Sequence, residues 1–248
     1  MTGTFKKSGP ESRYSMFEAE ADGLKELRSA GEIRVPDVID CGTANGQSYI
    51  ILEHLPLEPA SRETGQRFGE QLARLHRHTE DGFGWFRDNT IGPTPQINTP
   101  SDDWIEFFRA HRLGYQLDLA TTNGYGAHVE GPGRALMNRL PELFADYAPA
   151  ASLLHGDLWG GNWGSVNGEP VIFDPAVYYG DRESDIAMTM LFGGFGRPFY
   201  DAYERTWPMA PGHEQRIKLY QLYHLLNHLN LFGRSYLGRA MSLINDLL

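Results

Sequence analysis

Cysteine and long apolar runs are nearly absent from this sequence. Cys41 is the single cysteine among 248 residues, so an internal disulfide is impossible and we expect a protein of the reducing cytoplasm. No run approaches the roughly 18 apolar residues of a membrane-spanning helix, and the opening MTGTFKKSGP lacks the apolar stretch of a signal peptide. We therefore expect no membrane partner.

Positive charge is also scarce. The 22 lysines and arginines are outnumbered by 32 aspartates and glutamates, which gives a formal net charge of -10. General binding to nucleic acid depends on a basic surface that neutralises phosphates, so we expect no nucleic-acid partner. Any phosphate group that this protein handles must be held by a local arrangement of residues.

What remains is the composition of a folded globular protein. Hydrophobic residues make up 41%, charged residues 22% and aromatic residues 12% of the chain. A length of 248 residues fits one large domain or two unequal lobes. The chain is therefore long enough to bury a sizeable core.

The first part of the chain predicts a small sheet with one helix. Apolar and small residues recur at helical spacing over 11–28, and Gly31 follows as a stop signal. Over 38–52, two β-rich runs flank Asn45 and Gly46, which is the pattern of an antiparallel hairpin.

The remaining two thirds are predicted to be mainly helical. Two prolines within 55–59 favour an extended connector, so we place a boundary there between an N-lobe, 1–55, and a C-lobe, 56–248. We expect a glycine- and proline-rich loop over 81–100. The predicted helical segments are 64–79, 102–119 and 212–248, the last interrupted at Gly233 and Gly238.

Polar residues cluster where two short apolar strands end. Asp157 and Asn162 follow the strand at 152–154, and Asp174 follows the strand at 170–173. Mg²⁺ prefers oxygen ligands and binds one or two carboxylates together with substrate phosphates, so Asn162 and Asp174 suit a metal that bridges nucleotide phosphates. Asp157 then remains to accept a proton, as phosphoryl transfer requires. A purely structural role would bury three polar groups at a cost.

These segments resemble the fructosamine kinase (ketosamine 3-kinase) family, a small-molecule branch of the protein-kinase-like fold. The resemblance rests on LLHGDLWGGNWG, VIFDPAVYYGDRESDIAM and LYHLLNHLNLFG, with MFEAEADGL, IRVPDVI and YIILEHL upstream. It covers nearly the whole chain. It implies an α+β, protein-kinase-like two-lobed fold with an incomplete small β-rich N-lobe and a mainly helical C-lobe.

The resemblance also implies an activity. Members of the family are ATP-dependent kinases that use ATP and Mg²⁺ to phosphorylate the 3-hydroxyl of ketoamines such as fructosamines. The substrate is a small-molecule ketoamine or glycated amine, the adduct left when a sugar condenses with an amine. Phosphorylation destabilises this adduct, so the implied role is deglycation.

Residues of the catalytic segment take their roles from the resemblance. Asp157 matches the catalytic base, and Asn162 and Asp174 match the metal ligands. Asp185 resembles the buried carboxylate that braces the catalytic loop in this fold.

The nucleotide-binding residues come from the N-lobe. Lys7 matches the strand lysine that pairs with nucleotide phosphates, and Lys6 is the alternative, since only one of two adjacent strand residues can point inward. Glu20 is the expected partner of that lysine, with Glu18 the weaker candidate. The hinge that offers backbone groups to adenine corresponds to Leu52, Glu53, His54 and Leu55.

An acceptor site is expected between Trp159 and a C-terminal helix. Sugars need flat aromatic faces and hydrogen-bonding side chains, which Trp159, His224, Asn227 and His228 can supply. His224 and His228 also have the i, i+4 spacing of a zinc-protease helix, but leucine replaces the glutamate that should follow the first histidine. A substrate-facing or core role is therefore favoured.

One departure from the family concerns the N-terminus. Kinases of this family begin with two strands joined by a glycine-containing loop that covers the phosphates, whereas only six residues precede Lys7. The resemblance therefore implies an N-terminally shortened chain with weak nucleotide binding and very low transfer. It also implies an exposed N-lobe edge that favours self-association.

Two alternative functions stay open at this point. One is a related aminoglycoside- or choline-type small-molecule phosphotransferase. The other is a catalytically impaired nucleotide- or metabolite-binding pseudokinase that lacks the glycine-rich loop.

Overall fold

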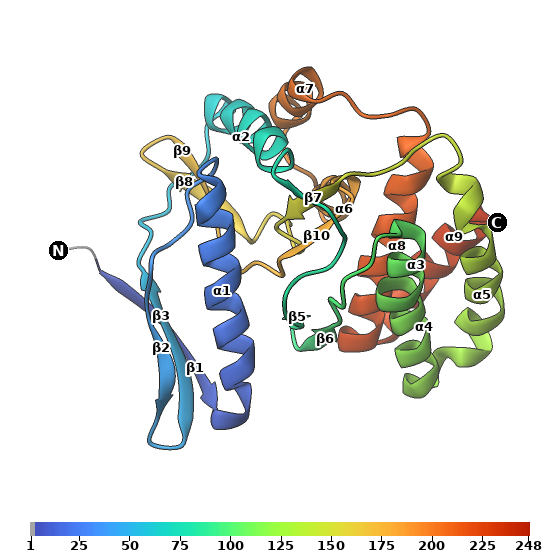
Figure 1. Cartoon of the computed structure of the whole chain (residues 1–248), viewed down its shortest axis with the longest axis horizontal. Helices are drawn as coiled ribbons and strands as arrows, with labels where there is room; N and C mark the ends of the chain where they lie inside the picture. Colours follow the sequence, from blue (N-terminus) through green and yellow to red (C-terminus); the bar gives the residue numbers. More distant parts are fainter. Residues whose placement is uncertain (1–2) are drawn as a thin grey trace.

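The N-terminal part of the computed structural model is a three-stranded antiparallel sheet with one long helix lying against it (Figure 1). The structure describes residues 3–248, so the first two residues of the predicted N-lobe lie outside the described residues. The sheet has the strand order β1-β3-β2. Its elements are β1 (Thr4–Pro10), a short 3₁₀ turn (Glu11–Arg13), α1 (Tyr14–Ala30), β2 (Val38–Ala44) and β3 (Gln47–Glu53).

Local sequence explains where these elements end. The hairpin between β2 and β3 turns at Asn45 and Gly46, whose φ values of 54° and 73° lie in the left-handed region that a two-residue hairpin loop requires. Helix α1 ends at Gly31, which is also left-handed, with a φ of 69°. The predicted helix, its stop and the hairpin are therefore confirmed.

Strand β1 lies at one edge of the sheet. Lys7 pairs with Ile50 of β3, and no second strand pairs with β1 among residues 3–248. The two adjacent lysines point to opposite faces, because Lys6 lies over the Tyr49 ring while Lys7 reaches Glu20 of α1. The edge that we expect to favour self-association is present in the described sheet, and self-association itself stays a prediction.

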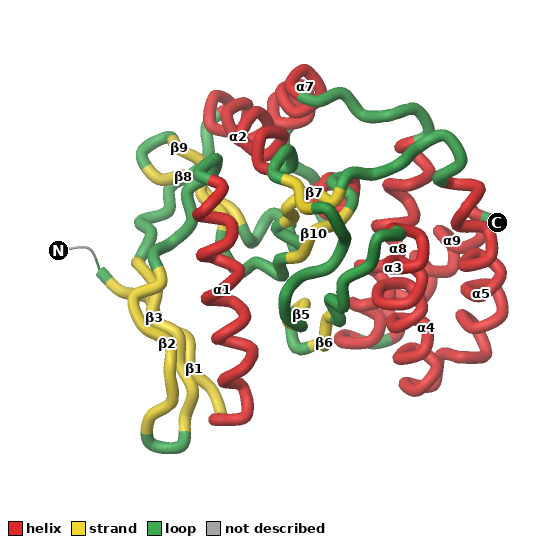
Figure 2. Tube along the Cα trace, in the orientation of Figure 1, coloured by secondary structure: helices red, strands yellow, loops and turns green. Residues whose placement is uncertain are grey.

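The C-terminal part is mainly helical, with a small sheet and two hairpins near the N-terminal part (Figure 2). The small sheet has the order β10-β7-β4. Its strands and hairpins are β4 (Thr79–Glu80), β5 (Asn89–Ile91), β6 (Thr94–Gln96), β7 (Ala151–Leu154), β8 (Trp163–Val166), β9 (Glu169–Ile172) and β10 (Tyr178–Gly180). Its main helices are α2 (Arg62–Leu75), α3 (Trp104–Phe108), α4 (Tyr115–Ala120), α5 (Gly126–Leu143), α6 (Glu183–Leu191), α7 (Arg197–Thr206), α8 (His213–Phe232) and α9 (Leu237–Leu247).

Three predictions for this part need correction. The helix predicted over 64–79 ends at Leu75, because the residues after it join the β7 sheet through β4. The predicted loop over 81–100 contains the β5–β6 hairpin. Gly233 ends α8 as predicted, with a φ of 88°, but Gly238 lies inside α9, where nothing approaches its open side.

The long C-lobe helix predicted over 102–119 is also interrupted. Helices α3, α4 and α5 are joined by two segments with π-helical hydrogen bonding, 109–114 and 121–125. No helix among residues 3–248 is both long enough and apolar enough to cross a bilayer.

Helices α2 and α7 pack so closely that one glycine is required between them. A Cβ atom on Gly69 would lie 2.1 Å from the carbonyl oxygen of Phe199, whereas a Cβ on Gly65 of the same helix meets nothing within 4 Å. Beside this contact, the Phe68 ring lies 4.9 Å from the Trp163 ring and 5.2 Å from the Phe199 ring, centroid to centroid. The α2–α7 contact thus anchors an aromatic core behind the β8–β9 hairpin.

We expect Gly69→Ala to lower the free energy of unfolding by about 2–3 kcal/mol, because the added methyl group must displace backbone. The matched variant Gly65→Ala should raise it by about 0.5–1 kcal/mol, because alanine is the better helix former. Urea unfolding measured for both variants checks the pair. Equal effects at the two positions would contradict the close helix contact.

Candidate active site

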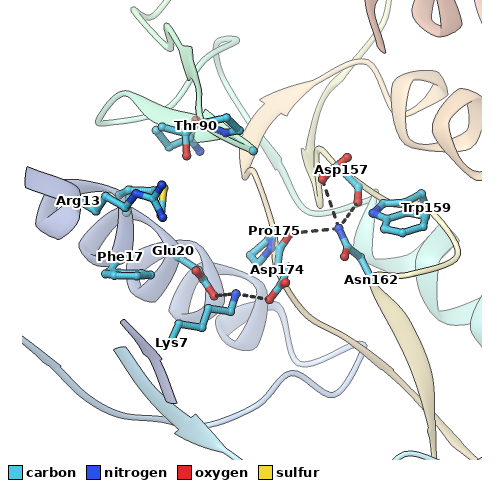
Figure 3. A pocket seen from close by; sticks show the side chains of 15 residues that line it. Lys7, Arg13, Phe17, Glu20, Thr90, Asp157, Trp159, Asn162, Asp174 and Pro175 are labelled. Carbon is cyan, nitrogen blue, oxygen red and sulfur yellow. Dashed lines mark hydrogen bonds and ion pairs between the residues drawn. The ribbon is translucent and has the colours of Figure 1, made fainter. Parts of the chain in front are cut away.

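The segment between β7 and β8 forms the predicted catalytic loop. Asn162 donates its side-chain N–H groups to the Asp157 carbonyl at 2.8 Å and to the Asp157 carboxylate at 3.3 Å. The same amide lies 3.4 Å from the Asp174 carbonyl oxygen. The three predicted catalytic and metal-binding residues therefore meet in space, as Figure 3 shows.

A buried carboxylate holds this loop from behind. Asp185 accepts hydrogen bonds from the backbone N–H groups of His155 and Gly156, both at 2.8 Å. His76 lies 3.2 Å from the same carboxylate through its Nε2 atom. Burial disfavours the charge of Asp185, but hydrogen bonding and charge interaction with His76 and His155 keep its pKa below the ordinary value. Asp185 thus occupies the bracing position that we predicted.

The turn at Gly156 and the turn at Asp174 fit against each other. Gly156 has a φ of 83°, and a Cβ atom there would lie 2.0 Å from the Ala176 carbonyl oxygen. The Ala176 N–H donates to the His155 carbonyl at 2.8 Å. Asp174 also has a left-handed backbone, with a φ of 57°, which is uncommon for a residue other than glycine. Such strain is typical of functional sites that the surrounding structure holds in place.

Lys7 joins the N-terminal sheet to the turn that carries Asp174. Its Nζ atom lies 2.7 Å from the Glu20 carboxylate and 2.5 Å from the Asp174 carboxylate. Burial alone lowers the pKa of Lys7, but the two carboxylates outweigh it and the pKa is raised. Burial raises the pKa of Glu20, and Lys7 acts against this shift. Lys7 thus pairs with Glu20, whereas Lys6 lies over the Tyr49 ring and Glu18 pairs with Arg87, and the role of Lys7 and Glu20 in nucleotide binding stays a prediction.

Asp157 has the electrostatic properties of a general base. Burial raises the pKa of Asp157 to about 7, and the negative charges of Asp185 and Asp174 act in the same direction. The hydrogen bond from Asn162 acts in the opposite direction. A carboxylate with a pKa near neutrality can accept a proton far more readily than an ordinary aspartate.

Asn162 and Asp174 fit a hard divalent cation. All hydrogen bonds of the Asn162 side chain are made by its nitrogen atom, which leaves its Oδ1 atom available as a ligand among the residues described. Asp174 is 45% exposed and contributes carboxylate oxygens to the same cleft. Oxygen donors of this kind are what Mg²⁺ prefers. No cluster of three histidine, cysteine or acidic residues suits a metal within 3–248.

The predicted hinge borders a second, more apolar cavity. This cavity has a volume of about 230 Å³, and its lining includes Phe5, Leu55 and Phe173. The N–H groups of Glu53 and His54 already donate to backbone carbonyls, those of Asp37 and Gly3. The Leu55 N–H, in contrast, has no acceptor among the described part of the chain.

The four predicted acceptor residues divide into two groups. Trp159 is 42% exposed and lines a cleft of about 360 Å³ together with Asp157. His224 and Asn227 are buried in α8, and His228 lies 4.6 Å from the Phe192 ring, centroid to centroid. These three α8 residues are not part of the cleft lining. Their role in acceptor binding stays a prediction.

The buried histidine of α8 is uncharged. Burial, with a smaller contribution from His228, lowers the pKa of His224 to about 3. Its Nδ1 atom is buried and has no hydrogen-bond partner within 3–248. The His228 Nδ1–H donates to the His224 carbonyl at 2.8 Å. His224 is thus a buried residue of the α8 packing, and His228 is packed against Phe192 and Tyr236.

Sequence reasoning missed one wall of the cleft. Asn89, Thr90, Gly92 and Pro93 of the β5–β6 hairpin line it, and so does Arg13 before α1. A short β-rich run followed by glycine over 89–92 was the available signal for the hairpin. The signal for Arg13 was its helical spacing from Glu20.

The small sheet with its helix and the mainly helical C-terminal part have the fold of solved phosphotransferases. A solved aminoglycoside phosphotransferase, in complex with ADP and hygromycin B, matches 99% of this chain and 86% of its own with a TM-score of 0.61. At 18% identity this likeness shows the fold alone. The fold thus defines the class as protein-kinase-like, which confirms the expected α+β, two-lobed fold class.

Proteins with higher sequence identity to this chain show to which family within this class it belongs. Residues 2–248 match the sequence profile of the family described as fructosamine kinase. A relative from Synechocystis, assigned as a ketoamine kinase, is 44% identical over 246 residues, 98% of this chain and 82% of its own length. A crystal structure assigned as a fructosamine-3-kinase from Haemophilus somnus matches with a TM-score of 0.92 and 34% identity, over 99% and 83% of the two chains. The chain belongs to the fructosamine kinase family.

We expect Asp185→Ala to lower the free energy of unfolding by about 3 kcal/mol or more, because it leaves buried N–H donors of the catalytic loop without an acceptor. Asp102→Ala is the matched control, since Asp102 is exposed and makes no hydrogen bond or ion pair among the described residues. Guanidinium unfolding with both variants measures the difference. If Asp185→Ala lowered the free energy of unfolding by less than about 1 kcal/mol, the catalytic loop would not depend on Asp185 for its conformation.

Proposed function

We propose that this protein is an ATP-dependent kinase that phosphorylates the 3-hydroxyl of a ketoamine. The observation that carries the proposal is the single cleft that brings Lys7, Asp157, Asn162 and Asp174 together from three distant segments. The names of the similar proteins, ketoamine kinase and fructosamine-3-kinase, support the same substrate class. The likeness to aminoglycoside phosphotransferases concerns the fold alone and favours no second acceptor.

ATP is proposed to lie along β1, with adenine at the hinge. The apolar cavity beside Phe5 and Phe173 suits a flat base, and the Leu55 N–H, which has no acceptor within residues 3–248, suits an adenine nitrogen. Lys7, two residues beyond Phe5 along the strand, then faces the phosphates. Glu20 and Asp174 together orient the Lys7 ammonium group.

Asn162 and Asp174 are proposed to hold Mg²⁺ through their side-chain oxygens. A bound divalent cation would offset the negative charge of the phosphates, which phosphoryl transfer requires. Asn162 is fixed for this role, because its nitrogen atom is engaged by Asp157. Asp174 is fixed because its backbone is held against the catalytic loop through Ala176.

Asp157 is proposed to take the proton from the sugar hydroxyl. As the hydroxyl oxygen bonds to the γ-phosphorus, the bond from that phosphorus to the ADP oxygen breaks and the hydroxyl proton passes to the Asp157 carboxylate. Asn162 keeps the carboxylate in place by donating to one of its oxygens. The protein forms no covalent bond to the substrate in this step, so its main contribution to the rate is to position the hydroxyl group and the γ-phosphate.

Trp159 is proposed to form the flat surface on which the sugar lies. A Cβ atom on Gly161 would lie 2.4 Å from the Trp159 ring, so glycine allows this ring to rest on the loop backbone. The ring is thereby presented at the cleft beside Asp157. Aromatic faces suit the C–H groups of a sugar ring.

We expect Asp157→Asn to reduce kcat roughly 10²–10⁴-fold, the usual contribution of a positioned general base. The carboxylate form is the base, so kcat/KM of the parent should fall as the pH drops through about 7. Coupled ADP release with a fructosyl amine, measured from pH 5.5 to 9, gives both results. Because a carboxylate with a raised pKa costs folding free energy above that pKa, Asp157→Asn should not lower the Tm at pH 8.

The same assay separates transfer from binding alone. A parent protein that binds ATP but phosphorylates no fructosyl amine would support the pseudokinase alternative. Parental turnover by Asp157→Asn would show that another group is the base.

We expect Trp159→Ala to raise the KM for the ketoamine about threefold to tenfold, since an aromatic contact contributes about 0.5–1.5 kcal/mol. The KM for ATP should stay unchanged. Phe86→Ala is the matched control, because Phe86 is 71% exposed and lies outside this cleft. Steady-state kinetics with each substrate varied in turn test the difference, and equal shifts in both KM values would place Trp159 outside the acceptor site.

A further inference from the structure

The cleft extends past the proposed phosphate site toward the start of α1. Arg13, Phe17 and Glu20 are spaced by four and three residues, so they share one face of the helical segment. Figure 3 shows these side chains on one wall of the cleft, across from Asp157 and Trp159. At 1.5 Å per residue, Arg13 lies about 10 Å along the helix from Glu20.

The order of groups along β1 places Arg13 at the end opposite to adenine. Phe5 lines the apolar hinge cavity, and Lys7 bonds Asp174. Gly9 follows, and a Cβ atom there would lie 3.0 Å from the Arg13 side chain. Each step of two residues along a strand covers about 7 Å. Arg13 therefore lies beyond the lysine that faces the phosphates.

Arg13 is also the cleft cation whose charge is not offset by a carboxylate. Lys7 is held by Glu20 and Asp174, whereas the exposed Arg13 side chain makes no ion pair or hydrogen bond within residues 3–248. An arginine guanidinium is planar and matches a carboxylate through two parallel N–H donors. An anionic ligand group would complete this end of the cleft.

The wall of the cleft formed by the hairpin is rigid. Asn89 donates to the Val177 carbonyl at 2.7 Å, and Gln96 donates to the Ala176 carbonyl at 3.0 Å. Tyr223 of α8 donates to Gln96 at 3.1 Å. All of these side chains are buried, so the hairpin is fixed to the segment that carries Asp174. A ligand bound between Arg13 and the hairpin would meet a preformed site.

We propose that Arg13 binds a carboxylate on the amine part of the ketoamine, which makes ketoamines of amino acids and other carboxylate-bearing amines the favoured acceptors. The inference rests on the proposed function, because it assumes that the sugar hydroxyl lies at Asp157. Trp159 and Arg13 line the same cleft, so the amine substituent of a sugar placed beside Trp159 can reach along α1 toward Arg13. ATP occupies the other end of the cleft.

The test compares two acceptors that differ in one group, fructosyl-glycine and fructosyl-glycinamide. Arg13→Gln should raise the KM for fructosyl-glycine roughly tenfold, the loss expected for one charge-assisted hydrogen bond. It should leave the KM for fructosyl-glycinamide and for ATP unchanged, and Arg13→Lys should recover part of the loss. Lys6→Gln is the matched control, because it removes the same charge from the opposite face of β1.

The outcomes distinguish this inference from the proposed function. Equal KM changes for the two acceptors, or none, overturn the carboxylate site while leaving kinase activity established. A raised KM for ATP alone assigns Arg13 to the phosphates and also overturns the proposal. A parent protein that phosphorylates neither acceptor refutes the proposed function itself.

Discussion

The hydrogen bonds from two successive backbone N–H groups to Asp185 are the constraint on which the active site depends. They fix the His155–Gly156 peptide, and through it the direction in which Asp157 leaves the strand. Because the acceptor is fully buried and charged, these bonds are stronger than ordinary backbone bonds. The position of Asp157 is therefore set from the buried interior of the C-terminal part and not from the cleft that Asp157 lines.

The N-terminal part and the C-terminal part of the chain are joined by an ion pair and by a backbone hydrogen bond. Lys7 of the N-terminal sheet reaches Asp174 of the C-terminal part, and the Ile172 N–H donates to the Arg34 carbonyl at 3.0 Å. One contact is an ion pair at the cleft, and the other is a backbone bond behind it. Together they hold β1, which carries Lys7, against the segment after β9 that carries Asp174.

The sequence was most informative where one residue type had a strict local role. Asn45-Gly46 predicted a hairpin, and the spacing of Asp157, Asn162 and Asp174 predicted a cluster that the structure brings together. The same Asn-Gly signal at 167–168 marks the β8–β9 turn, which was not predicted. The Asn89–Gln96 contacts could not be predicted, because they join segments about 80 residues apart through neutral amides whose partners are backbone carbonyls. Nor could helical spacing show that the two α8 histidines are not among the residues that line the cleft.

The ion pair of Lys7 has a consequence for the chemical durability of the protein. A lysine amine condenses with the carbonyl group of a sugar only in its neutral form. Glu20 and Asp174 raise the pKa of Lys7 and so keep the neutral fraction small. An enzyme that handles sugar adducts works where reducing sugars are present, and an adduct on this lysine would block its own cleft. The carboxylates that orient Lys7 thus also favour the protonated form of its amine, the form that does not condense with sugars.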